Sequence, residues 1–174
     1  MTTINFISSC PDIEILNDVL FGIIDPGGRA PAKISRLASE IWVATIVNSL
    51  GVEIIFAPID NCAYFNNYRK AADRVNKLGT QPEKEKQCDC ILAYTGSIIF
   101  IELKSSQLNG AIEQLLQTVK YFATNSQLAD IPNKTAYAIR PTREYIAKGA
   151  TSGYKEKLNT YGVLLKEKAP IVIS

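Results

Sequence analysis

The chain contains no histidine, and that absence removes several kinds of chemistry at once. Serine–histidine–aspartate and cysteine–histidine catalysis, acid–base catalysis by imidazole and histidine-ligated zinc are all excluded. The four cysteines, Cys10, Cys62, Cys88 and Cys90, include no CxxC pair, so a zinc or iron–sulfur framework is not expected either. We expect reduced core thiols, with Cys88 and Cys90 on the same face of one strand. Any reaction of this chain must therefore use carboxylates, lysine, tyrosine, serine or cysteine.

Long apolar runs are lacking as well. No stretch approaches the roughly 18 apolar residues that span a membrane. The opening residues, MTTINFISSC, do not combine a basic region with a following apolar one, so no secretory signal is expected. These two features predict a cytoplasmic protein with no membrane partner.

Neither sign of charge dominates, since 19 basic and 17 acidic residues give a net charge of +2. From position 133 onward, however, eight basic residues stand against three acidic ones. This basic third could follow nucleic-acid phosphates, or it could be an ordinary lysine-rich surface. The length of 174 residues fits a single domain, 1–174, with a core over about 31–140 and a basic α-β extension over 141–174.

The order of apolar patterns predicts a mixed α/β protein with one central sheet flanked by helices. Helical spacing and helix-boundary residues predict helices over 11–22, 31–50, 62–78, 108–124 and 152–162. Runs rich in β-branched and aromatic residues predict strands over 52–59, 87–94, 97–104, 134–140 and 163–167. Thr95-Gly96 joins two of these strands as a tight hairpin.

The hairpin carries charged residues in strands that are otherwise apolar. Asp89 lies on the first strand, and Glu102 and Lys104 share one face of the second. Symmetric pairing about Thr95-Gly96 puts Asp89 opposite Glu102, because the two are equally far from the turn. Facing carboxylates repel each other, so a positive charge must offset them. Either Lys104 does this alone, in a structural charge cluster, or a divalent cation binds beside them.

The geometry favours the divalent cation. Mg²⁺ typically takes one or two carboxylates, keeps several waters and accepts phosphate oxygens from a substrate. The predicted ligands of Mg²⁺ or Mn²⁺ are Asp89, Glu102 and the main-chain carbonyl of Leu103. Lys104 is then expected to orient or activate the water that attacks phosphorus.

Asp89, followed 13 positions later by Glu102-Leu103-Lys104 on the next strand and then by a helix, resembles the PD-(D/E)XK nuclease superfamily. That superfamily includes restriction endonucleases, Holliday-junction resolvases and RecB-type exonucleases. The resemblance covers residues 31–140 and implies a restriction endonuclease-like fold, with a mixed central sheet, flanking helices and an α-β-β-β-α-β core. Cys88 stands where the family usually has a proline.

The helix after the motif extends the resemblance. Gln117 and Tyr121 have the Q-x-x-x-Y spacing of the RecB-like branch, which implies that Gln117 supports the active site and that Tyr121 approaches the substrate phosphates. The alternative is a helix that is simply polar on its outer side. Arg140 and Arg143, which follow the next strand, are further candidates for phosphate contacts; ordinary surface arginines are the alternative.

Glu40 provides a second point of similarity. Many nucleases of this type carry a glutamate on the helix before the first core strand, where it contributes to the metal site. Glu40 falls in the helix predicted over 31–50. The alternative is an ion pair with Arg36, four residues earlier.

Together these features imply a Mg²⁺- or Mn²⁺-dependent phosphodiesterase, either an endonuclease or an exonuclease, that favours DNA over RNA. A chain of this length leaves little room for a recognition domain, so loops, a partner protein or the second subunit of a homodimer would supply specificity. Three alternatives stay open. They are an RNase on the same fold, a catalytically silent nucleic-acid-binding or protein-interaction domain, and a structural protein in which the three charged residues form an ion cluster.

Overall fold

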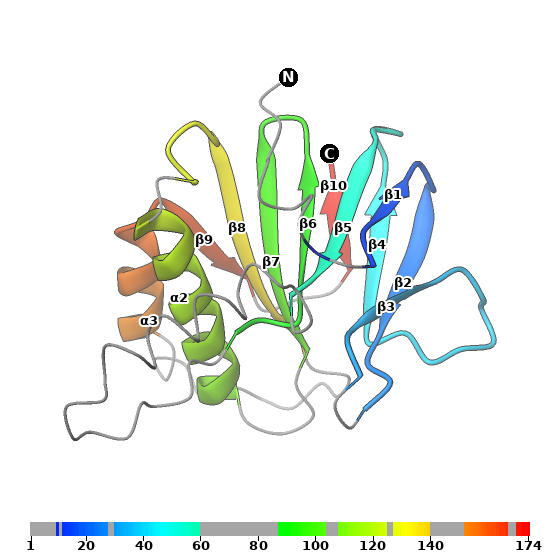
Figure 1. The fold of residues 1–174 in the computed structure, drawn as a ribbon, viewed down its shortest axis with the longest axis horizontal. Coiled ribbons are helices and arrows are strands. Elements are labelled where there is room, and N and C mark those ends of the chain that lie inside the picture. Colours follow the sequence, from blue (N-terminus) through cyan, green and yellow to red (C-terminus); the bar gives the residue numbers. More distant parts are fainter. Residues whose placement is uncertain are drawn as a thin grey trace.

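The computed structural model describes residues 10, 12–27, 30–59, 87–103, 108–124, 127–139, 152–166 and 170–174. These residues form a mixed α/β protein with two β-sheets and two helices (Figure 1). The class predicted from the sequence is therefore confirmed, but the number of sheets is not, since one sheet was expected.

The larger sheet has six strands and contains the predicted hairpin. Its strands lie in the spatial order β1 (Glu14–Leu16), β5 (Ile54–Pro58), β6 (Cys90–Tyr94), β7 (Ser97–Leu103), β8 (Asn133–Ile139) and β9 (Val163–Lys166). Neighbours from β1 to β7 are antiparallel, whereas β7, β8 and β9 run parallel. Every residue of β7 is buried, as expected for a central strand with both faces covered.

The smaller sheet has four strands, in the order β10 (Ile171–Ile173), β4 (Ala44–Asn48), β2 (Leu20–Ile24) and β3 (Lys33–Ser35). It packs on one face of the larger sheet, while α2 (Leu108–Thr124) and α3 (Ser152–Asn159) cover the other face (Figure 1). The molecule thus has three layers, with the six-stranded sheet in the middle.

Two groups of buried side chains hold these layers together. The helix-side core joins α2 to the larger sheet and contains Phe100 and Phe122, whose rings meet edge to face at 5.4 Å. The inter-sheet core lies between the sheets and contains Phe21 and Phe56. Strand β7 contributes to both, because successive side chains point to opposite faces of a strand. Consequently, Ile98 and Phe100 enter the helix-side core, and Ile99, Ile101 and Leu103 enter the inter-sheet core.

The helices predicted over 11–22 and 31–50 are wrong. The first range contains β1 and the start of β2, and the second contains β3 and β4. In β4, the sequence ATIVN alternates between buried and half-buried positions, which is the strand period, and its β-branched residues suit a sheet. Two residues that suggested a helical stripe, Leu37 and Ile41, lie in the β3–β4 connection and are 60% and 86% exposed. Tertiary pairing outweighed an apparent helical spacing here.

The remaining predictions are largely confirmed where the structure describes them. The strands over 52–59, 87–94, 97–104, 134–140 and 163–167 correspond to β5 to β9, and the helices over 108–124 and 152–162 to α2 and α3. The helix expected over 62–78 lies outside the described residues. The sequence reading missed β10, whose three residues pair in parallel with β4.

The cysteines differ from expectation in two ways. Cys88 and Cys90 are buried and reduced, as predicted, but Cys10 takes part in a disulfide. Cys88 lies in the helix-side core and Cys90 in the inter-sheet core, so they do not share a face. The reason is that β6 begins only at Cys90, and strand alternation does not extend back to Cys88. Cys62 lies outside the described residues.

Candidate metal centre

The hairpin has the symmetric register from which the pairing of Asp89 with Glu102 was predicted. Paired residues run from Tyr94 and Ser97 beside the turn to Cys90 and Ile101 at the other end. One further step in this register is Asp89 and Glu102, the pair that symmetry about the turn predicted. Gly96 has a φ of 64°, a conformation that suits glycine and that closes the two-residue turn.

Asp89 is fixed through both its side chain and its main chain. Its Oδ2 accepts a hydrogen bond of 2.6 Å from the Leu103 N–H, which directly follows Glu102. Its carbonyl oxygen accepts a hydrogen bond of 2.9 Å from the Ile59 N–H at the end of β5. Asp89 is half-buried, and therefore partly open to solvent.

Glu102 lies near the end of the central strand β7 and is 0% exposed. It alternates with Ile101 and Leu103, which face the inter-sheet core, so Glu102 is on the α2 side of the sheet. Its neighbour on β8 is Ala138, which has a small side chain. A buried carboxylate is costly unless it is paired or hydrogen-bonded, and such groups are concentrated at functional sites. Glu102 is thus the strongest single candidate for a functional residue in the described part of the chain.

Helix α2 holds the segment that leads into Asp89. The Thr118 Oγ1 accepts a hydrogen bond of 2.8 Å from the Cys88 N–H, and the Gln114 Nε2 donates one of 2.8 Å to the Gln87 carbonyl oxygen. Thr118 was not among the predicted site residues, although a threonine among the apolar residues of a buried helix face was a usable signal.

The two RecB-like positions are both half-buried on α2. Tyr121 packs against the helix-side core, and its ring meets Phe122 edge to face at 5.9 Å. Gln117 lies three residues beyond Gln114 and one turn before Tyr121 on the same helix. A supporting role for Gln117 and a phosphate contact for Tyr121 stay predictions.

Glu40 does not join this group. It is exposed in the connection between β3 and β4, where its N–H donates to the Leu37 carbonyl oxygen in a turn. Figure 1 shows this connection at the opposite side of the molecule from α2. The helix that was to carry Glu40 towards the metal is absent, because the segment forms two strands of the smaller sheet.

The alternative ion pair between Glu40 and Arg36 is not formed either. Arg36 pairs with Asp18 at 3.2 Å and with Glu14 at 3.5 Å. The hydrogen bond to the Asp18 carboxylate raises the pKa of the Arg36 guanidinium. These side chains are largely exposed, so the ion pairs add little to stability.

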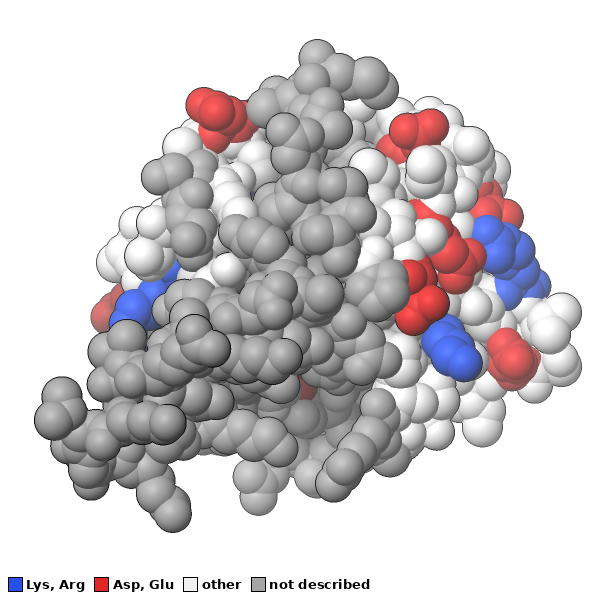
Figure 2. Space-filling view, viewed as in Figure 1, with Lys and Arg blue, Asp and Glu red and all other residues white. Residues whose placement is uncertain are grey.

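Three other predicted site residues, Lys104, Arg140 and Arg143, lie outside the described residues. The basic C-terminal third is described in part, and some of its charges have local roles. The Lys134 Nζ donates to the carbonyl oxygens of Leu128 and Ile131, at 3.3 and 2.6 Å, and so caps a loop. Lys157 lies over the ring of Tyr154. Figure 2 shows acidic and basic side chains interspersed, rather than gathered by sign, on the face in view.

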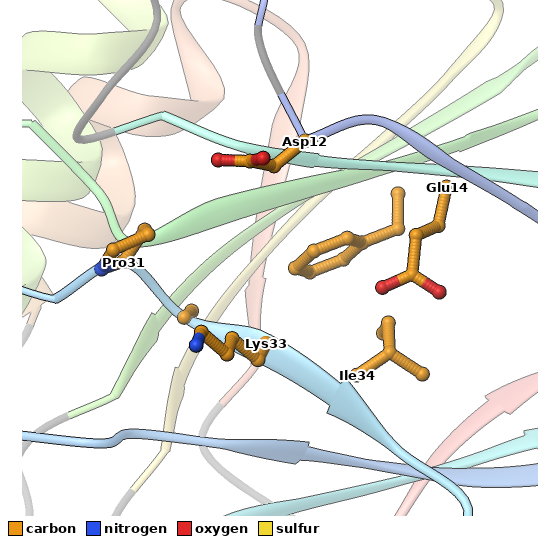
Figure 3. A pocket seen from close by; sticks show the side chains of 7 residues that line it. Asp12, Glu14, Pro31, Lys33 and Ile34 are labelled. Carbon is orange, nitrogen blue, oxygen red and sulfur yellow. The ribbon is translucent and has the colours of Figure 1, made fainter.

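A shallow cavity of about 220 Å³ lies elsewhere, between the edge strands β1 and β3. Figure 3 shows Asp12, Glu14 and Lys33 at its rim, and Phe56 also lines it. Its charged lining residues are partly or fully exposed, and Glu14 already pairs with Arg36. Neither Asp89 nor Glu102 lines this cavity.

Comparisons of the chain with protein-family models, curated proteins and solved structures give no significant match.

Among the described residues, histidine, cysteine and acidic side chains form no group of three or more that could hold a metal ion. Asp89 and Glu102 would supply two carboxylates, and Mg²⁺ often binds through one or two carboxylates together with water and substrate. Within the same residues, no helix is long and apolar enough to cross a membrane.

Proposed function

We propose that this chain is a metal-dependent nuclease that hydrolyses phosphodiester bonds, with DNA favoured over RNA. The observation that carries the proposal is the hydrogen bond between the Asp89 carboxylate and the main chain directly after Glu102, at the open end of the β6–β7 hairpin. Glu102 is fully buried. Asp89 is half-buried, and its carboxylate accepts this hydrogen bond from the Leu103 N–H. This arrangement concentrates negative charge at one place in an otherwise apolar sheet.

The order of elements around the pair supports the same proposal. Strands β5, β6 and β7 are successive antiparallel neighbours, and α2 then leads to β8 beside β7 in parallel. Among the described elements, this β-β-β-α-β order agrees with all but the first element of the core that the PD-(D/E)XK resemblance implies. The chain departs from that core at the first element, since the smaller sheet replaces the helix expected before β5.

The residues fit a hard divalent cation, because both groups offer carboxylate oxygens. Asp89 and Glu102 would hold Mg²⁺ or Mn²⁺, with the Leu103 carbonyl as a further ligand. The bound metal would supply charge stabilisation for the phosphate and a more acidic water at neutral pH. Lys104 would orient or activate the attacking water, and Gln117 would support the site.

The test is titration of Mn²⁺ and Mg²⁺ by calorimetry, with cleavage assays on plasmid DNA, single-stranded DNA and RNA in parallel. Glu102→Gln keeps the side-chain volume and removes the charge, and Glu102→Ala removes the ligand altogether. We expect metal affinity and cleavage to fall at least about 100-fold in both variants. Removing a residue that only hydrogen-bonds to a metal ligand already lowers metal affinity or activity about 10- to 100-fold, and Glu102 would be a ligand itself. Glu53→Gln, at an exposed glutamate before β5, is the matched control.

The outcomes separate the alternatives. Metal binding and cleavage that both disappear in the Glu102 variants, but not in Glu53→Gln, would support the nuclease and identify its substrate. Nucleic-acid binding without cleavage would support a silent binding domain. A wild-type chain that binds neither metal, with or without nucleic acid, would overturn the proposal and leave the charged residues as a structural cluster.

A further inference from the structure

The segment just before Asp89 is held by a helix rather than by the sheet. Strand β6 begins at Cys90, and its last pair with β7 is Cys90 with Ile101. Gln87 and Cys88 are nevertheless buried, at 7% and 0% exposure. Buried main-chain groups need hydrogen-bond partners, and here α2 provides them.

Two side chains of α2 form hydrogen bonds with a single peptide unit. The Cys88 N–H donates to the Thr118 Oγ1, and the Gln87 carbonyl oxygen of the same peptide bond accepts from the Gln114 Nε2. The two helix residues are four apart and so lie on one face. They are also linked to each other, because the Thr118 hydroxyl donates at 2.9 Å to the Gln114 carbonyl oxygen. Thr118 is 1% exposed, so water does not compete for its hydroxyl.

This anchor, defined as Gln114 and Thr118, acts on the residue that follows. A planar peptide held at both of its polar groups fixes the direction in which the chain enters Asp89. The Asp89 carbonyl oxygen is then bound by β5 and its carboxylate by β7. Three elements therefore determine where the Asp89 carboxylate lies relative to Glu102.

We propose that Thr118, with Gln114, is a positioning residue that sets Asp89 for metal binding. This inference rests on the proposed function, since it assigns the anchor to the metal site described above. Neither residue touches the metal. The hydroxyl at position 118 maintains the separation of the two carboxylates, and metal affinity depends on it.

Three threonine variants test the inference. Thr118→Val removes the hydroxyl with almost no change of shape, and Thr118→Ser keeps it. Thr124→Val is the matched control, because Thr124 makes the same kind of bond, to the Lys120 carbonyl oxygen at 2.8 Å, near the exposed end of α2. Each variant is titrated with Mn²⁺, exchange of the Cys88 amide proton is measured by NMR, and folding is checked by urea unfolding.

We expect Thr118→Val to fold and to bind Mn²⁺ about 10- to 100-fold more weakly than wild type. Loss of a group that orients a metal ligand commonly lowers metal affinity by this factor. Its Cys88 amide should exchange faster, whereas Thr118→Ser and Thr124→Val should bind near the wild-type value. If Thr118→Val does not fold, Gln114→Met, which removes the other bond to the same peptide, takes its place with the same expectation.

Two results would overturn the inference, and they differ from each other. Wild-type affinity in folded Thr118→Val, or in its Gln114→Met replacement, would show that the anchor stabilises the chain without setting the site. Absence of Mn²⁺ binding by the wild-type chain would overturn the proposed function and the inference with it.

Discussion

At the scale of single residues, the hydrogen bond from the Leu103 N–H to the Asp89 carboxylate allows the structural and the metal-binding roles of Asp89 to be tested separately. An asparagine at position 89 can still accept this bond through its amide oxygen, but it lacks the negative charge that a cation needs. An alanine loses both. Comparing the two variants therefore separates the contribution of the carboxylate to stability from its contribution to metal binding.

We predict that Asp89→Asn folds with little loss of stability but loses most of its Mn²⁺ affinity. Asp89→Ala should be less stable than wild type by about 1–3 kcal/mol, because a main-chain N–H loses its partner. Urea unfolding and calorimetric titration of the three proteins measure both quantities. A structural ion cluster predicts another pattern, in which Asp89→Asn costs stability and no variant changes metal affinity, because wild type binds none.

The sequence predicted the β6–β7 register, on which the expected Asp89–Glu102 pair depends, because a hairpin register is local information. Strand alternation and a two-residue turn determine which residues face each other, and both can be read from twenty consecutive positions. The anchor at Thr118 could not be predicted in this way, since it joins a side chain to a main-chain group 30 residues earlier. The position of Glu40 depended on a helix that does not form.

At the scale of elements, the helix α2 and the strand β4 show when a sequence pattern is decisive. Seven buried residues of α2 lie at helical spacing over 17 residues, and this long period has no strand equivalent. The segment over 31–50 has apolar residues at helical spacing too, but only over about nine residues. The β-branched residues of this segment come after those nine residues. They form β4, which pairs with β2 and β10, so the segment contains strands rather than a helix.

The β3–β4 connection folds back over the smaller sheet through Trp42. The indole Nε1 donates to the Ser35 Oγ at 3.2 Å and to the Leu37 carbonyl oxygen at 3.1 Å, and the ring covers Gly22. A Cβ at position 22 would overlap the ring atoms nearest the Trp42 Cβ. The absence of a side chain on β2 is therefore what allows this loop to pack.

We predict that Gly22→Ala lowers the free energy of unfolding by about 1–3 kcal/mol, the usual cost of overpacking. Gly110→Ala is the control, since nothing lies within 4 Å of a Cβ at that position of α2. That variant should be more stable by roughly 0.5–1 kcal/mol, because alanine favours a helix interior over glycine. Equal stability of Gly22→Ala and wild type in urea unfolding would mean that Trp42 does not pack on β2.

At the scale of the whole molecule, the question is whether three layers behave as one domain. The six-stranded sheet contributes to both cores, since β5, β6, β7 and β8 each supply side chains to both. Losing either outer layer would expose one complete face of this sheet, which is an apolar face. The single domain over 1–174 expected from the length thus requires that the layers unfold together.

The chain contains one tryptophan, and its location makes this requirement measurable. Trp42 reports on the smaller sheet by fluorescence, while far-UV circular dichroism at the helical band reports on helices that include α2 and α3, on the other side of the larger sheet. We predict that the two signals give the same urea midpoint and the same slope, as in two-state unfolding. Phe56→Leu, which thins the inter-sheet core, should shift both curves together by the same amount. A fluorescence transition at lower urea than the dichroism transition would mean that the smaller sheet is a separate unit, and that the carboxylate pair belongs to a domain formed by the larger sheet and its helices alone.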